Sequence, residues 1–147
     1  MVWTALRHAH AAVEDALEAV LGQIGLDMAA YEVLYRLAHH DGGAMRMHAL
    51  ADHALLTPSG LTRLIERLER AGYVSRRHCP SDRRGTEAVI TPAGHEALAE
   101  AEPAIERAVT EQFGAELTDT ESAALLRAFR KLLARHGRDS ALGACEG

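Results

Sequence analysis

The sequence predicts a mainly α-helical protein that carries one small β-hairpin. Of its 147 residues 48% are apolar and only 4% aromatic, so helix formers such as Ala and Leu dominate over the residues that strands favour. Apolar residues recur at steps of three and four along most of the chain, and they alternate with polar ones only within residues 74–90. A chain of this length can build one sizeable core, so we expect a single domain over residues 1–147.

Three helices are expected in the first third of the chain. An amphipathic helix is predicted over residues 3–23, where apolar side chains recur at steps of three, four and seven. Asp27 can accept backbone N–H bonds at the start of a second helix, which runs to about residue 39. A glycine-containing loop at 41–43 then leads to a short third helix over residues 46–54.

The start of a fourth helix at Thr57 and Pro58 is the clearest boundary in the chain. Thr57 can cap this helix while Pro58 occupies its first position, where the missing N–H costs nothing. The helix is expected to run to about residue 71, and Gly72 supplies the stop. Its apolar stripe has the spacing of one buried helix face and consists of Leu61, Leu64, Ile65 and Leu68.

The segment after the fourth helix changes its period from helical to two. Residues 74–78 and 86–90 are predicted as the strands of a hairpin, joined by a seven-residue loop at 79–85. This loop contains two adjacent arginines, Arg83 and Arg84.

Two further helices complete the predicted elements. The Thr-Pro pair at 91–92 repeats the cap-plus-proline start, and the fifth helix should reach about residue 113. Pro103 lies inside that helix and should kink or divide it, because its ring clashes with a carbonyl of the preceding turn. A capping box at 118–121 starts the last helix, and residues 137–147 are expected to form a disordered tail.

Charge is distributed unevenly along the chain. The net charge is −5, which by itself argues against a nucleic-acid partner. Residues 46–90, however, hold eight basic and five acidic residues, whereas the rest of the chain holds eight basic and sixteen acidic ones. A basic segment within an acidic protein is expected when one surface meets phosphates and the others stay solvated.

Helix, short turn, helix and hairpin, in this order, predict a winged helix-turn-helix that binds double-stranded DNA. The first turns of such a second helix reach base edges in the major groove. The candidates for base and nearby phosphate contact are Thr57, Ser59, Thr62 and Arg63, with Gly60 allowing close approach of the backbone. The hairpin loop places Arg83 and Arg84 where one of them can enter the adjacent minor groove, and Asp82 is expected to orient an arginine.

Three stretches of the chain carry a family resemblance. They are residues 56–74 followed by Arg76, the run Asp82-Arg83-Arg84, and the run Ile90-Thr91-Pro92-Ala93-Gly94. Together they resemble the core signature of the MarR family of bacterial winged-helix regulators, and the flanking helices match in order and length. The resemblance implies a homodimer that binds a pseudo-palindromic operator, usually as a repressor released by a small molecule. It further implies that Arg76 contacts DNA, that Arg84 inserts into the minor groove, and that Asp82 fixes the wing.

The resemblance also divides the chain into functional regions. Residues 28–91 would form the DNA-binding lobe, and residues 1–24 and 92–136 would form the dimerisation helices. The helices outside the helix-turn-helix carry apolar stripes, and a two-fold dimer would set its recognition helices about 34–36 Å apart, one turn of DNA. The alternative is that these stripes complete a monomeric core.

A small-molecule site is expected by resemblance in the cleft between the lobe and the dimerisation helices. Relatives often accept phenolic or other aromatic anions there. The candidate wall residues are Trp3, His10, Met28, Tyr31, Met47 and His48, and each of them is equally compatible with a core or surface role.

A metal or cofactor is not expected. The nine histidines include no pair at i, i+4, and the fifth helix, where metal-sensing relatives pair histidines, holds only His95. Cys79 and Cys145 lack the spacing of a zinc site or a disulfide framework, so we expect free thiols. Oxidation of Cys79, which lies in the wing, remains open because reactivity needs a lowered pKa.

Other function classes fit the sequence less well. It contains no nucleophile elbow, phosphate-binding loop or HExxH motif, so we expect no enzyme. The alternative to a DNA-binding regulator is a winged-helix protein-interaction module, but that module should lack the groove-facing polar residues and wing arginines present here. No apolar run approaches the roughly 20 residues that span a bilayer and no secretion signal is evident, so we expect a cytoplasmic protein without membrane contact.

Overall fold

The computed structural model describes residues 1–79 and 82–137, with the backbone alone at 82–84. Its helices are α1 (Val2–Gly22), α2 (Met28–Ala38), α3 (Met47–His53), α4 (Pro58–Arg70), α5 (Pro92–Val109) and α6 (Asp119–Arg135). Its strands are β1 (Ala44–Arg46), β2 (Val74–Cys79) and β3 (Asp82–Ile90), which form one antiparallel sheet in the order β1-β3-β2. The predicted fold class, mainly α with a small β wing, is confirmed.

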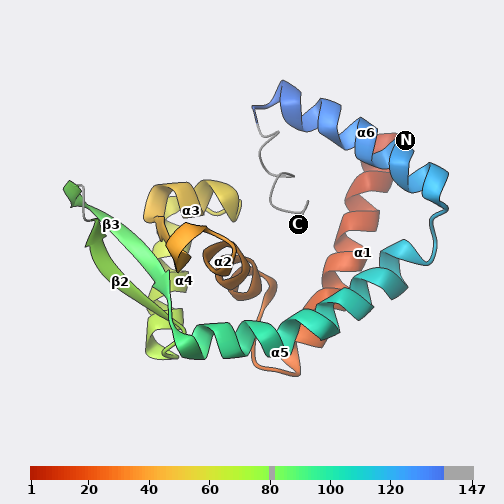
Figure 1. The fold of residues 1–147 in the computed structure, drawn as a ribbon. Coiled ribbons are helices and arrows are strands. Elements are labelled where there is room, and N and C mark those ends of the chain that lie inside the picture. Colours follow the sequence, from red (N-terminus) through yellow and green to blue (C-terminus); the bar gives the residue numbers. More distant parts are fainter. Residues whose placement is uncertain (80–81, 138–147) are drawn as a thin grey trace.

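The elements form two regions that α5 connects. Helices α2, α3 and α4 gather at the base of the β2–β3 hairpin, which projects as a wing (Figure 1). Helix α5 starts beside the base of the wing and runs across to pack against α1, and α6 follows beyond the end of α5 (Figure 1). We call residues 28–91 the lobe, and helices α1, α5 and α6 together with the turn that joins α5 to α6 the arm.

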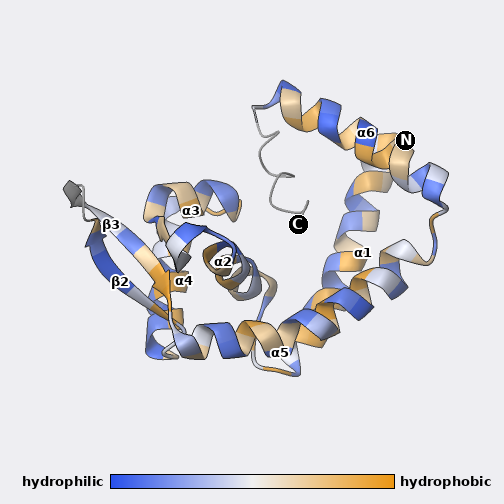
Figure 2. Ribbon diagram, viewed as in Figure 1, coloured by the Kyte–Doolittle hydropathy of each residue, from blue (hydrophilic) through white to orange (hydrophobic). Residues whose placement is uncertain are grey.

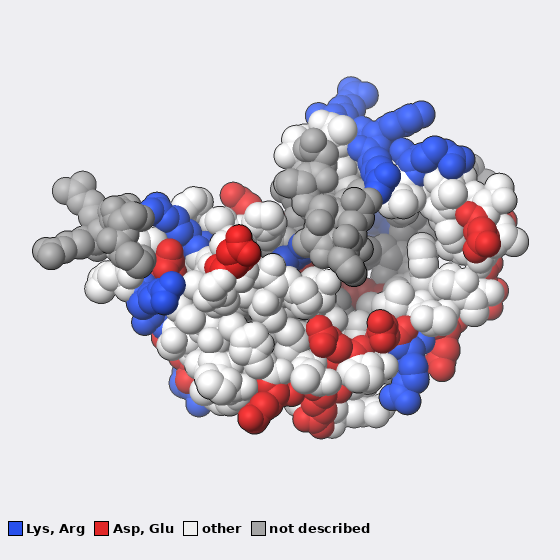
Figure 3. Space-filling view, viewed as in Figure 1, with Lys and Arg blue, Asp and Glu red and all other residues white. Residues whose placement is uncertain are grey.

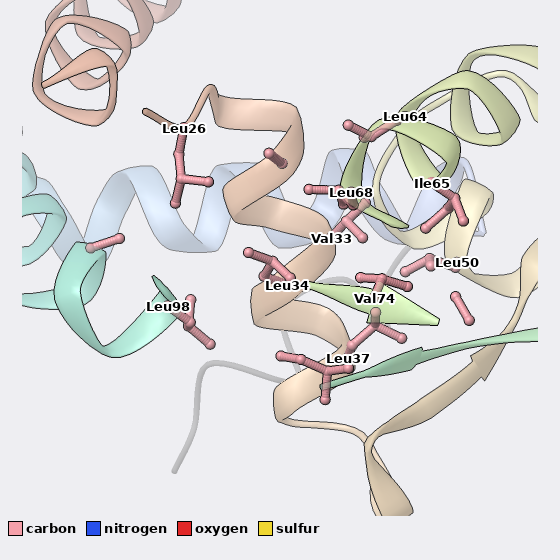
Figure 4. Close-up of a cluster of buried hydrophobic side chains, with 14 of the residues drawn as sticks. Leu26, Val33, Leu34, Leu37, Leu50, Leu64, Ile65, Leu68, Val74 and Leu98 are labelled. Carbon is pink, nitrogen blue, oxygen red and sulfur yellow. The ribbon is translucent and has the colours of Figure 1, made fainter. Parts of the chain in front are cut away.

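Helix α2 lies at the centre of the buried core. Its residues Val33, Leu34 and Leu37 are completely inaccessible to solvent. Figure 4 shows α2 between α4, which contributes Ile65 and Leu68, and the start of α5. Burying each such side chain stabilises the fold by about 1.5–3 kcal/mol relative to leaving it exposed, so this packing fixes the orientation of α4.

Four helices start at the side-chain caps that the sequence predicts. In each case a carboxylate or hydroxyl oxygen accepts a backbone N–H from the first turn, which satisfies a donor that the helix leaves unpaired. The pairs are Asp27 with Ala30 (2.8 Å), Thr57 with Gly60 (3.1 Å), Thr91 with Gly94 (3.1 Å) and Thr118 with Glu121 (3.3 Å). The predicted capping box at 118–121 is complete, since Glu121 accepts the Thr118 N–H at 2.9 Å.

The hairpin differs from its prediction. Its ladder continues to a pairing of Cys79 with Asp82, so the predicted seven-residue loop is wrong and most of that segment belongs to the strands. The side chains of residues 75–78 are exposed, so this part of β2 shows no apolar alternation from which the length of the strand could be predicted.

The short strand β1 was not predicted. It pairs with β3 in the register Ala44 to Val89 and Arg46 to Glu87, and it ends directly at the start of α3. A three-residue strand is too short to show a period, and only the distant strand β3 defines it. The strand ties the base of the wing to the helix-turn-helix.

Helix α5 is not divided at Pro103. The helix is continuous from Pro92 to Val109, bends along its length (Figure 1), and passes into a π-helical turn at Thr110–Gly114. Pro103 is exposed, so water can take the backbone carbonyl that its missing N–H leaves unpaired.

The arm leaves large apolar side chains at the surface. Helix α6 has no buried residue, and α1 buries only Leu17 and Leu21. Figure 2 shows apolar positions along α6 and along α1. The exposed fractions are 69% for Trp3, 44% for Phe113, 42% for Leu126 and 52% for Leu132.

Candidate nucleic-acid interface

Helix α4 presents a polar face at its N-terminal end. Its predicted apolar stripe is buried, so the opposite face, including Thr57, Ser59, Thr62 and Arg63, is exposed as predicted. The Thr62 hydroxyl donates to the Pro58 carbonyl at 2.9 Å, and the Thr57 and Ser59 hydroxyl oxygens lie 3.4 Å apart. Hydroxyls can both donate and accept hydrogen bonds, which is the chemistry that base edges and phosphates require.

Gly60 lies within the same first turn. A Cβ atom at this position would lie 3.0 Å from the hydroxyl oxygen of Thr57. The missing side chain therefore leaves room for the capping hydroxyl of Thr57 and adds no side-chain atoms over the backbone of this turn.

The arginines of α4 differ in their ion pairs. Arg63 is exposed and makes no ion pair within residues 1–79 and 85–137. Arg67 binds Asp27, the N-cap of α2. Burial alone raises the pKa of the Asp27 carboxyl, but hydrogen bonds from Arg67 and the Ala30 N–H outweigh it, and the pKa is lowered. Arg67 thus anchors α4 to α2, whereas Arg63 is available to a ligand.

Two arginines of the wing are paired as well. Arg76 on β2 binds Glu69 of α4 through two of its nitrogens, at 2.8 and 2.6 Å. Arg77 donates to Glu87 of β3 at 3.0 Å. The predicted DNA contact Arg76 is therefore held between wing and recognition helix, with one edge of its guanidinium occupied by a carboxylate.

A hollow of about 450 Å³ lies between α3, α4 and the wing. It is lined by Arg46, Met47, His48, Thr62, Arg76, Gly85 and Thr86. Three of these side chains are basic and two carry hydroxyls, so the hollow suits an anion. Arg46 was not among the site residues predicted from the sequence, where its only signal is its position just before the third helix.

The six predicted effector-pocket residues do not lie together. Met47 and His48 line the hollow beside α4. Met28 and Tyr31 are half-buried on α2, and burial together with the nearby carboxylates Glu102 and Glu106 raises the pKa of Tyr31 to about 12. The remaining two, Trp3 and His10, are exposed on α1, where His10 lies 3.4 Å from Glu14.

The wing residues Asp82, Arg83 and Arg84 belong to β3, but their side chains lie outside the described part of the structure. Their backbone places them at the far end of the projecting hairpin (Figure 1). The predicted roles of these three residues therefore stay predictions.

Figure 3 shows how charge is distributed over one face of the protein. Basic side chains lie near the wing and over α6, and acidic side chains lie along α5 and also beside the basic ones near the wing (Figure 3).

The described residues give no sign of a metal centre or a membrane segment. Within residues 1–79 and 82–137, no three His, Cys, Asp or Glu side chains gather as a metal site needs, and no helix is long and apolar enough to cross a membrane. Cys79 is buried and not in a disulfide, whereas Cys145 lies outside the described residues.

Comparison with known proteins places this geometry in a family. The model of the MarR family matches residues 26–86, which cover most of the lobe, from just before α2 into strand β3 of the wing. The transcriptional repressor Rv2887 of Mycobacterium tuberculosis is 30% identical over 129 residues, covering 88% of each chain.

Two solved structures extend the similarity to the whole fold. Sco3205, a MarR family regulator from Streptomyces coelicolor solved in complex with DNA, is 33% identical with a TM-score of 0.85, covering 89% of this chain and 82% of its own. BpsR from Bordetella bronchiseptica, whose DNA binding is regulated by 6-hydroxynicotinic acid, is 26% identical with a TM-score of 0.78, covering 89% and 97%.

Proposed function

The chain belongs to the MarR family of winged helix-turn-helix transcriptional regulators, and we propose that it acts as a homodimeric repressor of a pseudo-palindromic operator. The observation that carries the proposal is the exposed N-terminal face of α4, with Arg63 free of carboxylate partners among the described residues. A helix presented in this way fits the major groove, and the wing beside it can reach the adjacent minor groove.

The arm supports the homodimer. Helix α6 has no buried residue within one protomer, and Phe113, Leu126 and Leu132 are each at least 42% exposed. Apolar surface of this kind marks a protein interface. In our proposal, the dimer interface is formed by residues 1–24 and 92–136 of the two protomers. Each protomer then binds DNA through its own lobe, residues 28–91.

The first test is selection of genomic fragments by the purified protein, followed by titration across salt. We expect an inverted repeat whose half-sites lie about one helical turn apart, with affinity that falls steeply as salt rises. Sedimentation should give twice the mass of the 15.9 kDa chain. Weak binding indifferent to sequence would contradict the proposal and favour a protein-interaction module.

Replacement of Arg63 tests direct base contact. We expect Arg63→Ala to reduce the discrimination between operator and random DNA by about 1–3 kcal/mol, the value of a good base contact. Arg70→Ala, at the exposed C-terminal end of the same helix, is the matched control and should leave discrimination unchanged. An equal loss on both DNAs would assign Arg63 to phosphate.

Replacement of Arg84 tests the proposed minor-groove contact. We expect Arg84→Ala to weaken operator binding at fixed salt, while the dimer mass and melting temperature stay unchanged, because the residue lies near the wing tip. Arg107→Ala on α5 is a control for the loss of one positive charge far from DNA. Unaltered affinity of the Arg84 variant would rule out the contact.

We further propose that a small aromatic or phenolic anion releases the repressor. The hollow beside α4 supports this, because Arg46, His48 and Arg76 line it while Thr62 belongs to the DNA-facing helix. BpsR, with its hydroxynicotinic acid, is a regulated relative of comparable fold. Operator release measured with a panel of hydroxybenzoates, on the wild type and on Met47→Trp, which would fill the hollow, tests this site.

The relatives are regulators rather than enzymes, and we propose a non-enzymatic role for this chain. A repressor must reach chromosomal DNA, so we also propose that it acts in the cytoplasm. Fractionation of cells with a tagged full-length chain tests this location.

A further inference from the structure

Three helices of the protein end in the same backbone motif. After each, one residue adopts a left-handed conformation and the next residue returns its N–H to a carbonyl of the last helical turn, as in a Schellman motif. The returning bonds run from Leu26 to Leu21 (3.0 Å) after α1, from Leu56 to Ala51 (2.9 Å) after α3, and from Tyr73 to Leu68 (2.9 Å) after α4. The local geometry of the three ends is thus equivalent.

The residue in the left-handed position differs among them. It is Gly25 after α1 (φ 76°) and Gly72 after α4 (φ 79°), but it is Leu55 after α3 (φ 55°). Leu55 is the one non-glycine residue with positive φ among residues 1–79 and 82–137. A side chain in this conformation crowds its own carbonyl oxygen, so leucine is strained where glycine is not.

The fold gives this strain no compensation. The side chain of Leu55 is 71% exposed, whereas the neighbouring Leu56 packs against the core. A residue that destabilises its own turn and buries little is expected to have a role outside the stability of the protomer.

The position of Leu55 indicates that role. It lies in the turn of the helix-turn-helix, two residues before Thr57, which caps the exposed end of α4. It belongs to the lobe and not to the arm, whose exposed apolar residues account for the proposed dimer. Leu55 is thus a large exposed apolar residue close in sequence to the exposed Thr57 and Ser59 of the proposed DNA-binding surface.

We propose that Leu55 is an apolar contact to the operator, packing on carbon atoms of the DNA: a thymine 5-methyl group or a deoxyribose. The inference rests on the proposed function of α4 as a recognition helix. Thymine methyl groups and sugars are the apolar surfaces that DNA offers to such a side chain. In this proposal, the left-handed leucine lowers the stability of the turn and raises the affinity of the protein for DNA.

The test compares three variants on the operator selected by the wild type. Leu55→Gly should raise the melting temperature by about 2–4 °C and weaken operator binding about tenfold, because the contact is lost. Leu55→Asn, which tolerates the left-handed conformation without an apolar tip, should weaken binding equally. Leu55→Met should match the wild type in both measurements.

Gly72→Leu is the matched control for strain. A Cβ atom at Gly72 would have no neighbour within 4 Å, so this variant adds only the unfavourable conformation. Its melting temperature should fall by about as much as that of Leu55→Gly rises, while operator affinity at a temperature where it is folded stays unchanged.

Operators with deoxyuridine in place of thymine identify the surface that is contacted. If Leu55 packs on a methyl group, one substitution should weaken the wild type and leave Leu55→Gly unaffected. If all such operators bind the wild type equally, while Leu55→Gly still binds less tightly, the contact is to a sugar.

Two results would overturn the proposal. The first is that Leu55→Gly melts higher but binds the operator as tightly as the wild type, in which case the strain serves no contact. The second is that it melts lower, in which case Leu55 supports the protomer itself. Failure of the wild type to select any operator is a separate result, which removes the proposed function and this contact together.

Discussion

The chain contains the pattern Thr-Pro-x-Gly twice, and the structure uses the two copies differently. Thr57 to Gly60 begins α4, and Thr91 to Gly94 begins α5. In both copies the threonine caps the helix by accepting the glycine N–H at 3.1 Å. The backbone geometry is shared, but the surroundings of the two turns are not.

The first copy faces solvent and the second is packed against the wing. Around Thr57 and Ser59 the side chains are exposed, as a surface that meets DNA requires. At the second copy, the Thr91 hydroxyl donates to the Gly72 carbonyl at 2.6 Å, and Gly94 is buried so closely that a Cβ would lie 2.2 Å from the Tyr73 carbonyl oxygen. The same local motif therefore presents one helix to a ligand and fastens another to the fold.

The largest expected difference between the copies is at their glycines. Gly94→Ala should destabilise the protein by about 3 kcal/mol, because the new methyl group overlaps backbone that must move. Gly60→Ala should be near neutral, since the crowding of Thr57 is offset by a gain in helix propensity of up to about 1 kcal/mol. Thermal and urea unfolding of both variants measure this, and equal losses would show that the two turns are packed alike.

The two threonine variants should differ from each other in stability by less than the two glycine variants do. Thr57→Ala removes one cap, which costs about 1 kcal/mol. Thr91→Ala removes a cap and the hydrogen bond to Gly72, so we expect about 2 kcal/mol. Denaturant midpoints at matched m-values give the comparison. A Thr91 variant no less stable than the Thr57 variant would mean that the bond to Gly72 contributes nothing net.

The smallest expected effect on stability is that of the ion pair between Asp27 and Arg67, which anchors α4 to α2. Because the folded pKa of Asp27 is lowered, its bond with Arg67 contributes stability that is present above the unfolded pKa and lost as pH falls through the folded pKa. Asp27→Asn keeps a capping side chain and removes this titration. The stability difference between wild type and variant should be below about 1 kcal/mol at neutral pH, since the pair is partly exposed, and should shrink below about pH 4. A difference independent of pH would exclude the ion pair as its source.

Local features of the fold could be predicted from the sequence, and long-range ones could not. All four side-chain caps were correct, because each depends on residues within three positions of one another. Strand β1 was missed because its partner β3 lies far along the chain. The wing strands were predicted too short for another reason, since the exposed residues 75–78 show no apolar alternation toward the tip.

The same distinction holds at the candidate site. The exposure of Thr57, Ser59, Thr62 and Arg63 follows from the helical period of α4. That Arg67 and Arg76 are paired while Arg63 is not depends on Asp27 and Glu69, and only the folded chain brings these partners together. The effector residues scattered for the same reason: side chains on separate helices cannot be assigned to one cavity by spacing alone.

Because Gly94 is packed closely against the backbone of Tyr73, the start of α5 forms a stiff joint with the lobe. The helix and the lobe therefore rotate together. Helix α5 is 18 residues long, or about 27 Å, so a rotation of about 5° at one end displaces the other by about 2 Å. In a two-fold dimer both recognition helices move, and their separation changes by up to twice that displacement. A good hydrogen bond tolerates a change in donor–acceptor distance of only about 0.5 Å. A ligand that tilts this joint by a few degrees can therefore mismatch the spacing of the two half-sites without unfolding any part of the lobe.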